Sequence, residues 1–157
     1  MITKTIEISD YELERGKPMP SLQHAVIQSN ILNLIRNAYK KRFNVLPELS
    51  LELNGETFVP DLSIYNYFKV DLSELNIKYK VAPLLTIEIL SPTQTVIDLI
   101  LKMKKLIDNG VKSYWLVEPS TKTIFVYNHK KEQTTFASGL IHDKEINIEI
   151  NMEDIFE

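Results

Sequence analysis

An acidic residue, Glu88, lies inside the apolar run LLTIEIL at residues 84–90. If this run is a β-strand, the alternation of its side chains places Glu88 on the same face as Leu84 and Leu90. A carboxylate between apolar neighbours is desolvated, so it must be paired, protonated or bound to a cation. The alternative is a glutamate near the exposed end of a strand that pairs with a surface lysine.

A predicted β-hairpin contains two further acidic residues, Glu48 and Asp61. The dipeptide Asn54-Gly55 is a strong signal for a two-residue turn, and it separates VLPELSLEL at residues 45–53 from ETFVPDLSIY at residues 56–65. Because the turn fixes the register, counting outward from it predicts which residues of the two strands face each other.

By this count Leu51 faces Phe58 and Glu48 faces Asp61. Like charges directly opposite each other destabilise a strand pair, so a divalent cation or a basic side chain is expected between them. Two alternatives stay open. Pro60 and Asp61 could simply punctuate the strand, and a bulge at Pro60 could shift the register and remove the pairing.

A lysine, Lys102, lies on the helix that we expect over residues 93–108, directly after the strand with Glu88. It lies at the border of the apolar face, from which a long side chain can reach the strand ends. The alternative is an exposed ion pair with Asp98, one turn earlier. The apolar face is predicted to centre on Val96, Ile100, Met103 and Ile107, with Leu99 and Leu106 along one edge.

Carboxylates on adjacent strands with a lysine on the next helix suit metal-dependent hydrolysis of a phosphodiester. Mg²⁺ binds through a few carboxylates and keeps several waters. Such an ion can hold a phosphate and lower the pKa of an attacking water, and a lysine can stabilise the negative charge of the transition state. The chain has no cysteine and three histidines, so carboxylates would have to hold any metal.

The elements that must position these residues follow from hydrophobic periodicity and turn signals. Because the strand at 84–90 is followed by a helix and a second strand, we expect these two strands to be parallel with a right-handed crossover. The expected fold class is α/β, a mixed sheet flanked by α-helices. The remaining expected elements are helices at 9–17, 21–42 and 151–157 and strands at 111–119, 123–128, 133–138 and 146–150.

Composition limits the other possibilities. With 157 residues, 44% hydrophobic and 25% charged, we expect one folded domain over residues 1–157. The net charge is −3, so the chain as a whole lacks the excess of basic residues that is typical of nucleic-acid-binding proteins. No apolar run has the length of a membrane span and the start MITKTIEISDYELERGK has no signal-peptide core, so we expect a cytoplasmic protein with no membrane partner.

These motifs, in their order along the chain, resemble the Uma-two family of restriction-endonuclease-like proteins in the PD-(D/E)XK nuclease superfamily. The resemblance covers most of the chain. It rests on the strings ELERGKPMPSLQH, PD, IEILSPT, D-x-x-x-K and GVKSYWLVEP. It implies a restriction-endonuclease-like core.

The resemblance also implies roles for individual residues. Asp61 and Glu88 would be ligands of Mg²⁺ or Mn²⁺, Lys102 would be catalytic, and Glu48 would match an acidic residue that assists the metal or the water. The superfamily's lysine usually lies two residues after the glutamate, where this chain has Leu90, so its role would have moved to Lys102.

The chain departs from the family at two helix positions that commonly hold arginine and tyrosine, where it has Leu99 and Leu106. These departures predict weaker phosphate contacts near the helix. His24 matches a histidine at the start of the long helix, and we expect it to be packed or hydrogen-bonded rather than catalytic.

Two hypotheses follow. The first is a metal-dependent endonuclease that hydrolyses phosphodiester bonds in DNA, acting as a homodimer. The second is a catalytically weak or inactive module of the same fold, used for nucleic-acid or protein binding, with Tyr65, Tyr67 and Phe68 exposed for a partner. Nuclease chemistry requires the Asp61, Glu88 and Lys102 side chains to converge, whereas a module does not.

Overall fold

The computed structural model describes residues 8–157 of the chain. Its helices are α1 (Asp10–Arg15), α2 (Leu22–Ala38), α3 (Val96–Asp108) and α4 (Met152–Ile155). Its strands are β1 (Phe43–Pro47), β2 (Leu51–Leu53), β3 (Glu56–Phe58), β4 (Leu62–Asn66), β5 (Leu85–Ile89), β6 (Ser113–Glu118), β7 (Thr123–Tyr127), β8 (Gln133–Phe136), β9 (Leu140–Asp143) and β10 (Ile148–Asn151).

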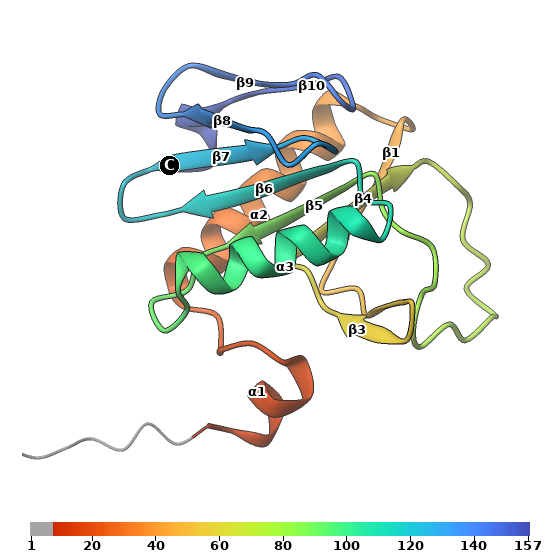
Figure 1. The fold of residues 1–157 in the computed structure, drawn as a ribbon. Helices are drawn as coiled ribbons and strands as arrows, with labels where there is room; N and C mark the ends of the chain where they lie inside the picture. Colours follow the sequence, from red (N-terminus) through yellow and green to blue (C-terminus); the bar gives the residue numbers. More distant parts are fainter. Residues whose placement is uncertain (1–7) are drawn as a thin grey trace, which may run out of the picture.

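The centre of the fold is a six-stranded sheet in the order β1-β4-β5-β6-β7-β8. Strands β5 and β6 are parallel and are joined by α3, while every other neighbouring pair in this sheet is antiparallel. Helix α2 covers one face of the sheet and α3 covers the other (Figure 1). The predicted mixed α/β sheet with flanking helices is therefore confirmed.

Alternation along β5 assigns its side chains to two hydrophobic clusters. Leu85, Ile87 and Ile89 belong to the cluster that includes residues of α2, α4 and the β9–β10 hairpin. Thr86 and Glu88, of opposite parity, therefore point toward the face covered by α3, whose own apolar residues form the second cluster with β2, β3 and β6.

The predicted hairpin register is confirmed, although its strands are interrupted. Leu51 pairs with Phe58 in the β2–β3 hairpin, and Pro47 pairs with Leu62 where β1 meets β4. Both pairs fit one continuous register, so the break at Pro60 causes no slip. The expected long strands are each split in two, and β2 and β3 form a separate two-stranded sheet.

The β2–β3 turn requires left-handed backbone at both of its central residues. Asn54 has φ 49° and Gly55 has φ 77°. Replacing Gly55 by Ala should lower the free energy of unfolding by about 1 kcal/mol, because an L side chain is strained at this φ. Gly55→Asn is the matched control, since Asn tolerates this conformation, and it should be milder in urea unfolding. Equal stability of the Gly55→Ala variant and the wild type would contradict this account of the turn.

Several element boundaries differ from the sequence-based expectation. Helix α2 ends at Ala38 rather than Arg42, and the Arg42 guanidinium instead donates to the backbone carbonyls of Ile146 and Asn147. Helix α3 begins at Val96 rather than residue 93. The N-cap of α3 is Thr95. Strand β9 was not predicted from the sequence.

The capping signals at the two chain ends are confirmed. Ser9 and Glu12 form the expected capping box of α1, and Asn151 caps α4.

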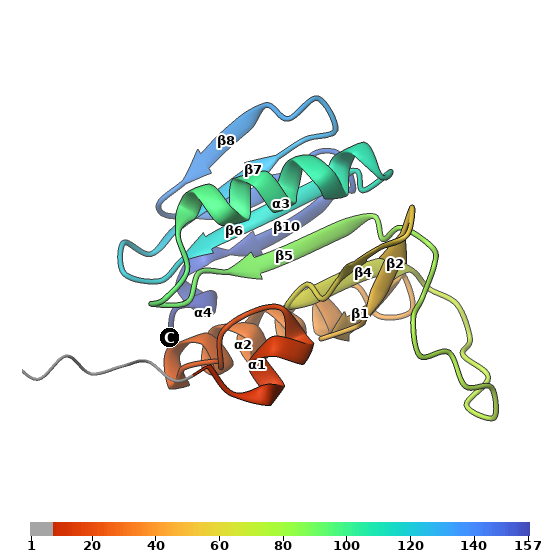
Figure 2. The ribbon, with the colours of Figure 1, turned by 60° about the horizontal axis from the view of Figure 1, so that its bottom comes forward.

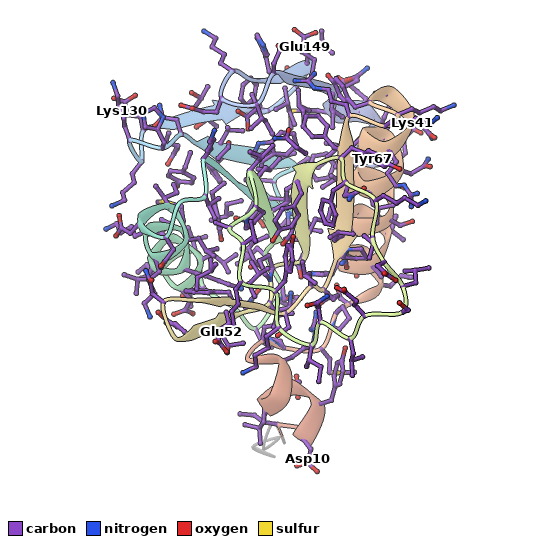
Figure 3. The ribbon with its side chains drawn as sticks, turned by 90° about the vertical axis from the view of Figure 1, so that its right-hand side faces the viewer. Asp10, Lys41, Glu52, Tyr67, Lys130 and Glu149 are labelled. Atoms are coloured by element: carbon purple, nitrogen blue, oxygen red, sulfur yellow. The ribbon has the colours of Figure 1, made fainter. Side chains whose placement is uncertain are left out.

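Tyr65 was predicted to be exposed and is buried, whereas Tyr67 is exposed at the start of the long loop that follows β4 (Figure 3). Among the described residues, no helix is long and apolar enough to cross a membrane.

Candidate active site

Three acidic residues lie in one row across neighbouring strands, and we call Glu48, Asp61 and Glu88 the acidic row. Leu62 pairs with Ile87, so the next position outward places Asp61 beside Glu88. The backbone N–H of Glu48 donates to the Asp61 carbonyl at 3.2 Å, as expected for residues that face each other across the hairpin. Glu88 contacts α3 through Lys102, whereas Asp61 contacts His24 of α2.

Glu88 is fully buried, and the Lys102 ammonium of α3 lies directly against its Oε1 atom. Its Oε2 atom accepts no hydrogen bond from the described part of the chain. Burial raises the pKa of Glu88, and the positive charge of Lys102 opposes this rise. Glu88 thus has its charge compensated at Oε1 and keeps Oε2 as a free acceptor.

The structure explains how Lys102 reaches this position. The buried residues of α3 include Leu99, Met103 and Leu106, whereas Val96 is 40% exposed. The buried face is therefore rotated from the predicted one, and Lys102 lies one turn from both Leu99 and Leu106. The alternative Asp98–Lys102 surface pair does not form, because Asp98 accepts hydrogen bonds from Thr95 at the helix N-terminus.

Asp61 is 1% exposed and has a partner at each oxygen. Its Oδ2 atom accepts a hydrogen bond from the Ile89 N–H at 2.7 Å and lies 3.0 Å from His24 Nε2. Its Oδ1 atom lies 2.5 Å from Lys17 Nζ. Burial opposes ionisation, but the contacts with His24, Lys17 and Ile89 hold the pKa of Asp61 well below its usual range.

Glu48 forms ion pairs with two basic residues from the N-terminal segment. Arg15 contacts its two carboxylate oxygens at 2.6 and 3.2 Å, and Lys17 Nζ lies 3.3 Å from Oε2. These side chains are the basic groups that the Glu48–Asp61 pairing required. Burial lowers the pKa of Lys17, but the charges of Glu88, Asp61 and Glu48 outweigh it, so the pKa of Lys17 is raised.

Arg15, Lys17 and Gln28 also belong to the site, although they were not predicted from the sequence. Gln28 of α2 donates to the Asp61 carbonyl at 2.8 Å. Arg15 and Lys17 lie in the string ELERGK, which the resemblance included, but no local signal shows that they pair with residues 48 and 61. His24 is buried and contacts Asp61, in agreement with the packed, hydrogen-bonded histidine that we expected.

The depressed pKa of Asp61 predicts a loss of stability in acid. The ionised carboxylate stabilises the fold above its ordinary pKa of 3.8, and this contribution disappears as the pH falls through the lower folded-state value. Between pH 6 and pH 2 the wild type should lose about 2 kcal/mol or more of unfolding free energy through this group. Urea unfolding of the wild type and of Asp61→Asn should therefore converge as the pH falls, and parallel curves would contradict the assignment.

A groove of about 290 Å³ opens beside the acidic row, between the α1–α2 connection, β3 and α3. Of the lysines on α3 and directly after it, Lys102 and Lys105 line the groove, whereas Lys104 and Lys112 do not. Two basic residues of the N-terminal segment complete its positive lining. The charged residues around the groove are Arg15, Lys17, Lys102 and Lys105 together with Glu56 and Asp98.

The donor chemistry of the site fits a hard divalent cation. As the side chains stand, residues 8–157 contain no group of three or more histidine or acidic residues arranged to hold a metal ion. Mg²⁺ needs only one or two carboxylates because it keeps several waters. Asp61 and Glu88 supply two from adjacent strands, and Glu88 Oε2 is without a hydrogen-bond donor.

Comparison with known proteins shows the family and the fold to which the chain is similar. The model of the Uma2 family, described as "Putative restriction endonuclease", matches residues 3–152. A similar solved structure is a "putative nuclease belonging to DUF820" from Anabaena variabilis, with a TM-score of 0.78 and 26% sequence identity over 88% of this chain and 83% of that chain. The search of curated proteins gave no match. The match over almost the whole chain shows that this protein belongs to the Uma2 family of restriction-endonuclease-like proteins.

Proposed function

We propose that this protein is a metal-dependent endonuclease that hydrolyses phosphodiester bonds in DNA. The observation that carries the proposal is the convergence of Asp61 and Glu88 on adjacent strands, with the Lys102 ammonium against Glu88. Nuclease chemistry requires this convergence, whereas a binding module does not. Family membership supports the nuclease class, and the DNA substrate and the metal are our inference.

Asp61 and Glu88 would hold Mg²⁺ or Mn²⁺. When bound, the ion supplies Lewis acidity and lowers the pKa of an attacking water. Asp61 is fixed for this task because the Ile89 N–H and His24 hold Oδ2, which leaves Oδ1 as the more adaptable oxygen. Glu88 approaches from the neighbouring strand, with Oε1 paired to Lys102 and Oε2 free of hydrogen-bond donors.

Lys102 and Glu48 would act on the reacting groups. In hydrolysis, a water oxygen bonds to phosphorus, the bond to the leaving oxygen breaks, and that oxygen gains a proton. Lys102 lies at the groove with 22% of its side chain exposed, so it can stabilise the extra negative charge on the phosphate. Glu48 is 32% exposed and could accept a proton from the attacking water once Arg15 moves away.

The groove provides a local positive surface on a chain whose net charge is −3. Phosphate contacts supply most of the nonspecific affinity for DNA, so a few basic side chains at one groove favour weak binding with a strong salt dependence. We also propose that residues 1–157 act as one nuclease-like domain and that two copies associate, because cleavage of both DNA strands together needs two active sites.

A cleavage assay tests the proposal. Purified wild type is incubated with supercoiled plasmid and with single-stranded DNA, each with Mg²⁺, with Mn²⁺ and with EDTA. We expect nicked or linear products only with metal, and none with Asp61→Ala. The nuclease hypothesis would be refuted if DNA stayed intact in every wild-type reaction and Asp61→Ala did not reduce metal binding. The hypothesis of an inactive binding module would then remain.

A further inference from the structure

The N-terminal segment contacts the rest of the chain mainly through two basic side chains. In α1 and its flanks, Ile8, Tyr11 and Leu13 are 64%, 52% and 66% exposed. Apolar burial therefore contributes little to holding this helix. Arg15 and Lys17, by contrast, have only 6% and 5% of their side chains exposed, and both reach the acidic row. Figure 2 shows α1 at the margin of the molecule, beside the start of α2.

The Lys17 ammonium lies where a bound cation would have to compete with it. It is 2.5 Å from Asp61 Oδ1 and 3.3 Å from Glu48 Oε2, so it occupies the oxygen that the backbone and His24 leave free. Arg15 Nη2 lies 3.9 Å from the same Asp61 oxygen. An ammonium and a metal ion cannot share this position, and each would neutralise the same carboxylate.

We propose that residues 9–20 form an autoinhibitory strap in which Lys17 takes the place of the metal ion and is released when the metal binds. The inference rests on the proposed metal site at Asp61 and Glu88. Because the strap and the metal compete for the same carboxylates, their binding is reciprocally coupled. Metal binding breaks the ion pairs between the strap and the acidic row, and a change that weakens these ion pairs increases the affinity for the metal.

The strap also connects metal binding to the substrate. Arg15, Gly16 and Lys17 line the groove that would receive a phosphate backbone. A polyanion in this groove competes with Glu48 and Asp61 for the two basic side chains. DNA and metal should therefore each promote release of the strap from the acidic row, and binding of one should tighten binding of the other.

Mn²⁺ titration followed by electron paramagnetic resonance tests the competition. Lys17→Met keeps the length of the side chain and removes its charge, and Lys104→Met removes an exposed charge from α3 as the matched control. We expect Lys17→Met to lower the Kd for Mn²⁺ at least about tenfold, because a charge a few ångströms away is lost, and Lys104→Met to leave it unchanged. An unchanged or higher Kd in Lys17→Met would overturn the strap.

A second measurement keeps Lys17 in place, in case Lys17→Met folds poorly. The chain has no cysteine, so Leu13→Cys with Lys104→Cys provides two unique sites for spin labels. Adding Mg²⁺ should change the distance between the labels, and the same pair in a Glu88→Gln background should not respond. An unchanged distance at Mg²⁺ saturation would also overturn the strap.

The two measurements separate this inference from the function on which it rests. Metal binding that is lost in Asp61→Ala but insensitive to Lys17→Met would overturn the strap and support the nuclease site. The absence of Mn²⁺ binding in the wild type and in Lys17→Met would contradict the proposed function and the strap together.

Discussion

Replacing Glu88 by Gln should abolish DNA cleavage while leaving the protein as stable as the wild type or more stable. The loss of activity should be roughly a thousandfold or more, because a metal ligand contributes several kcal/mol of transition-state stabilisation. Stability should not fall, because burial makes the ionised carboxylate unfavourable and raises the pKa of Glu88. Above pH 4.5 a neutral amide avoids this cost, and Lys102 can extend into the groove.

The test compares plasmid cleavage and urea unfolding of Glu88→Gln with those of Glu74→Gln, an exposed glutamate in the loop after β4. The control should change neither property. A large loss of stability in Glu88→Gln would show that Glu88 serves the fold, and full cleavage activity would exclude it as a ligand.

Replacing Lys102 by Met should reduce the cleavage rate by about a hundredfold to a thousandfold, the range for removing one electrostatic donor to a transition state. Metal binding should persist or tighten, because the Glu88 carboxylate loses its competing cation. Stability should fall, since a fully buried carboxylate is left without a partner. This combination of a slow rate with retained metal affinity distinguishes a phosphate-directed lysine from a metal ligand.

Lys104→Met is the control on the same helix, and its cleavage rate should equal that of the wild type. Lys102→Arg preserves the charge, so it should recover part of the rate and most of the stability. Wild-type cleavage by Lys102→Met would remove Lys102 from the catalytic groups.

The local parts of this site could be predicted from the sequence. Alternation in the run 84–90 placed Glu88 on the face opposite Ile87, and the Asn54-Gly55 turn placed Glu48 across from Asp61. Both predictions depend only on the period of a strand and the geometry of a two-residue turn, which act over a few residues.

The long-range parts could not be predicted. Arg15 and Lys17 reach partners 33 and 44 residues away, and no periodicity encodes that contact. The face that α3 buries depends on how it packs against the sheet. Met103 and Ile107 of the predicted centre are buried, but Val96 is 40% exposed, and Leu99, predicted at the edge, is buried. Strand splitting near residue 48 follows from the left-handed backbone of Glu48, φ 52°, which its residue type does not signal.

A crystal structure of the wild type soaked in Mn²⁺, with anomalous scattering recorded for the metal, tests the central claim most directly. We predict one strong anomalous peak in contact with the carboxylates of Asp61 and Glu88, with Lys17 Nζ moved from its present position 2.5 Å from Asp61. A fully soaked crystal with no peak at these two carboxylates, and with the Lys17–Asp61 ion pair intact, would contradict the account.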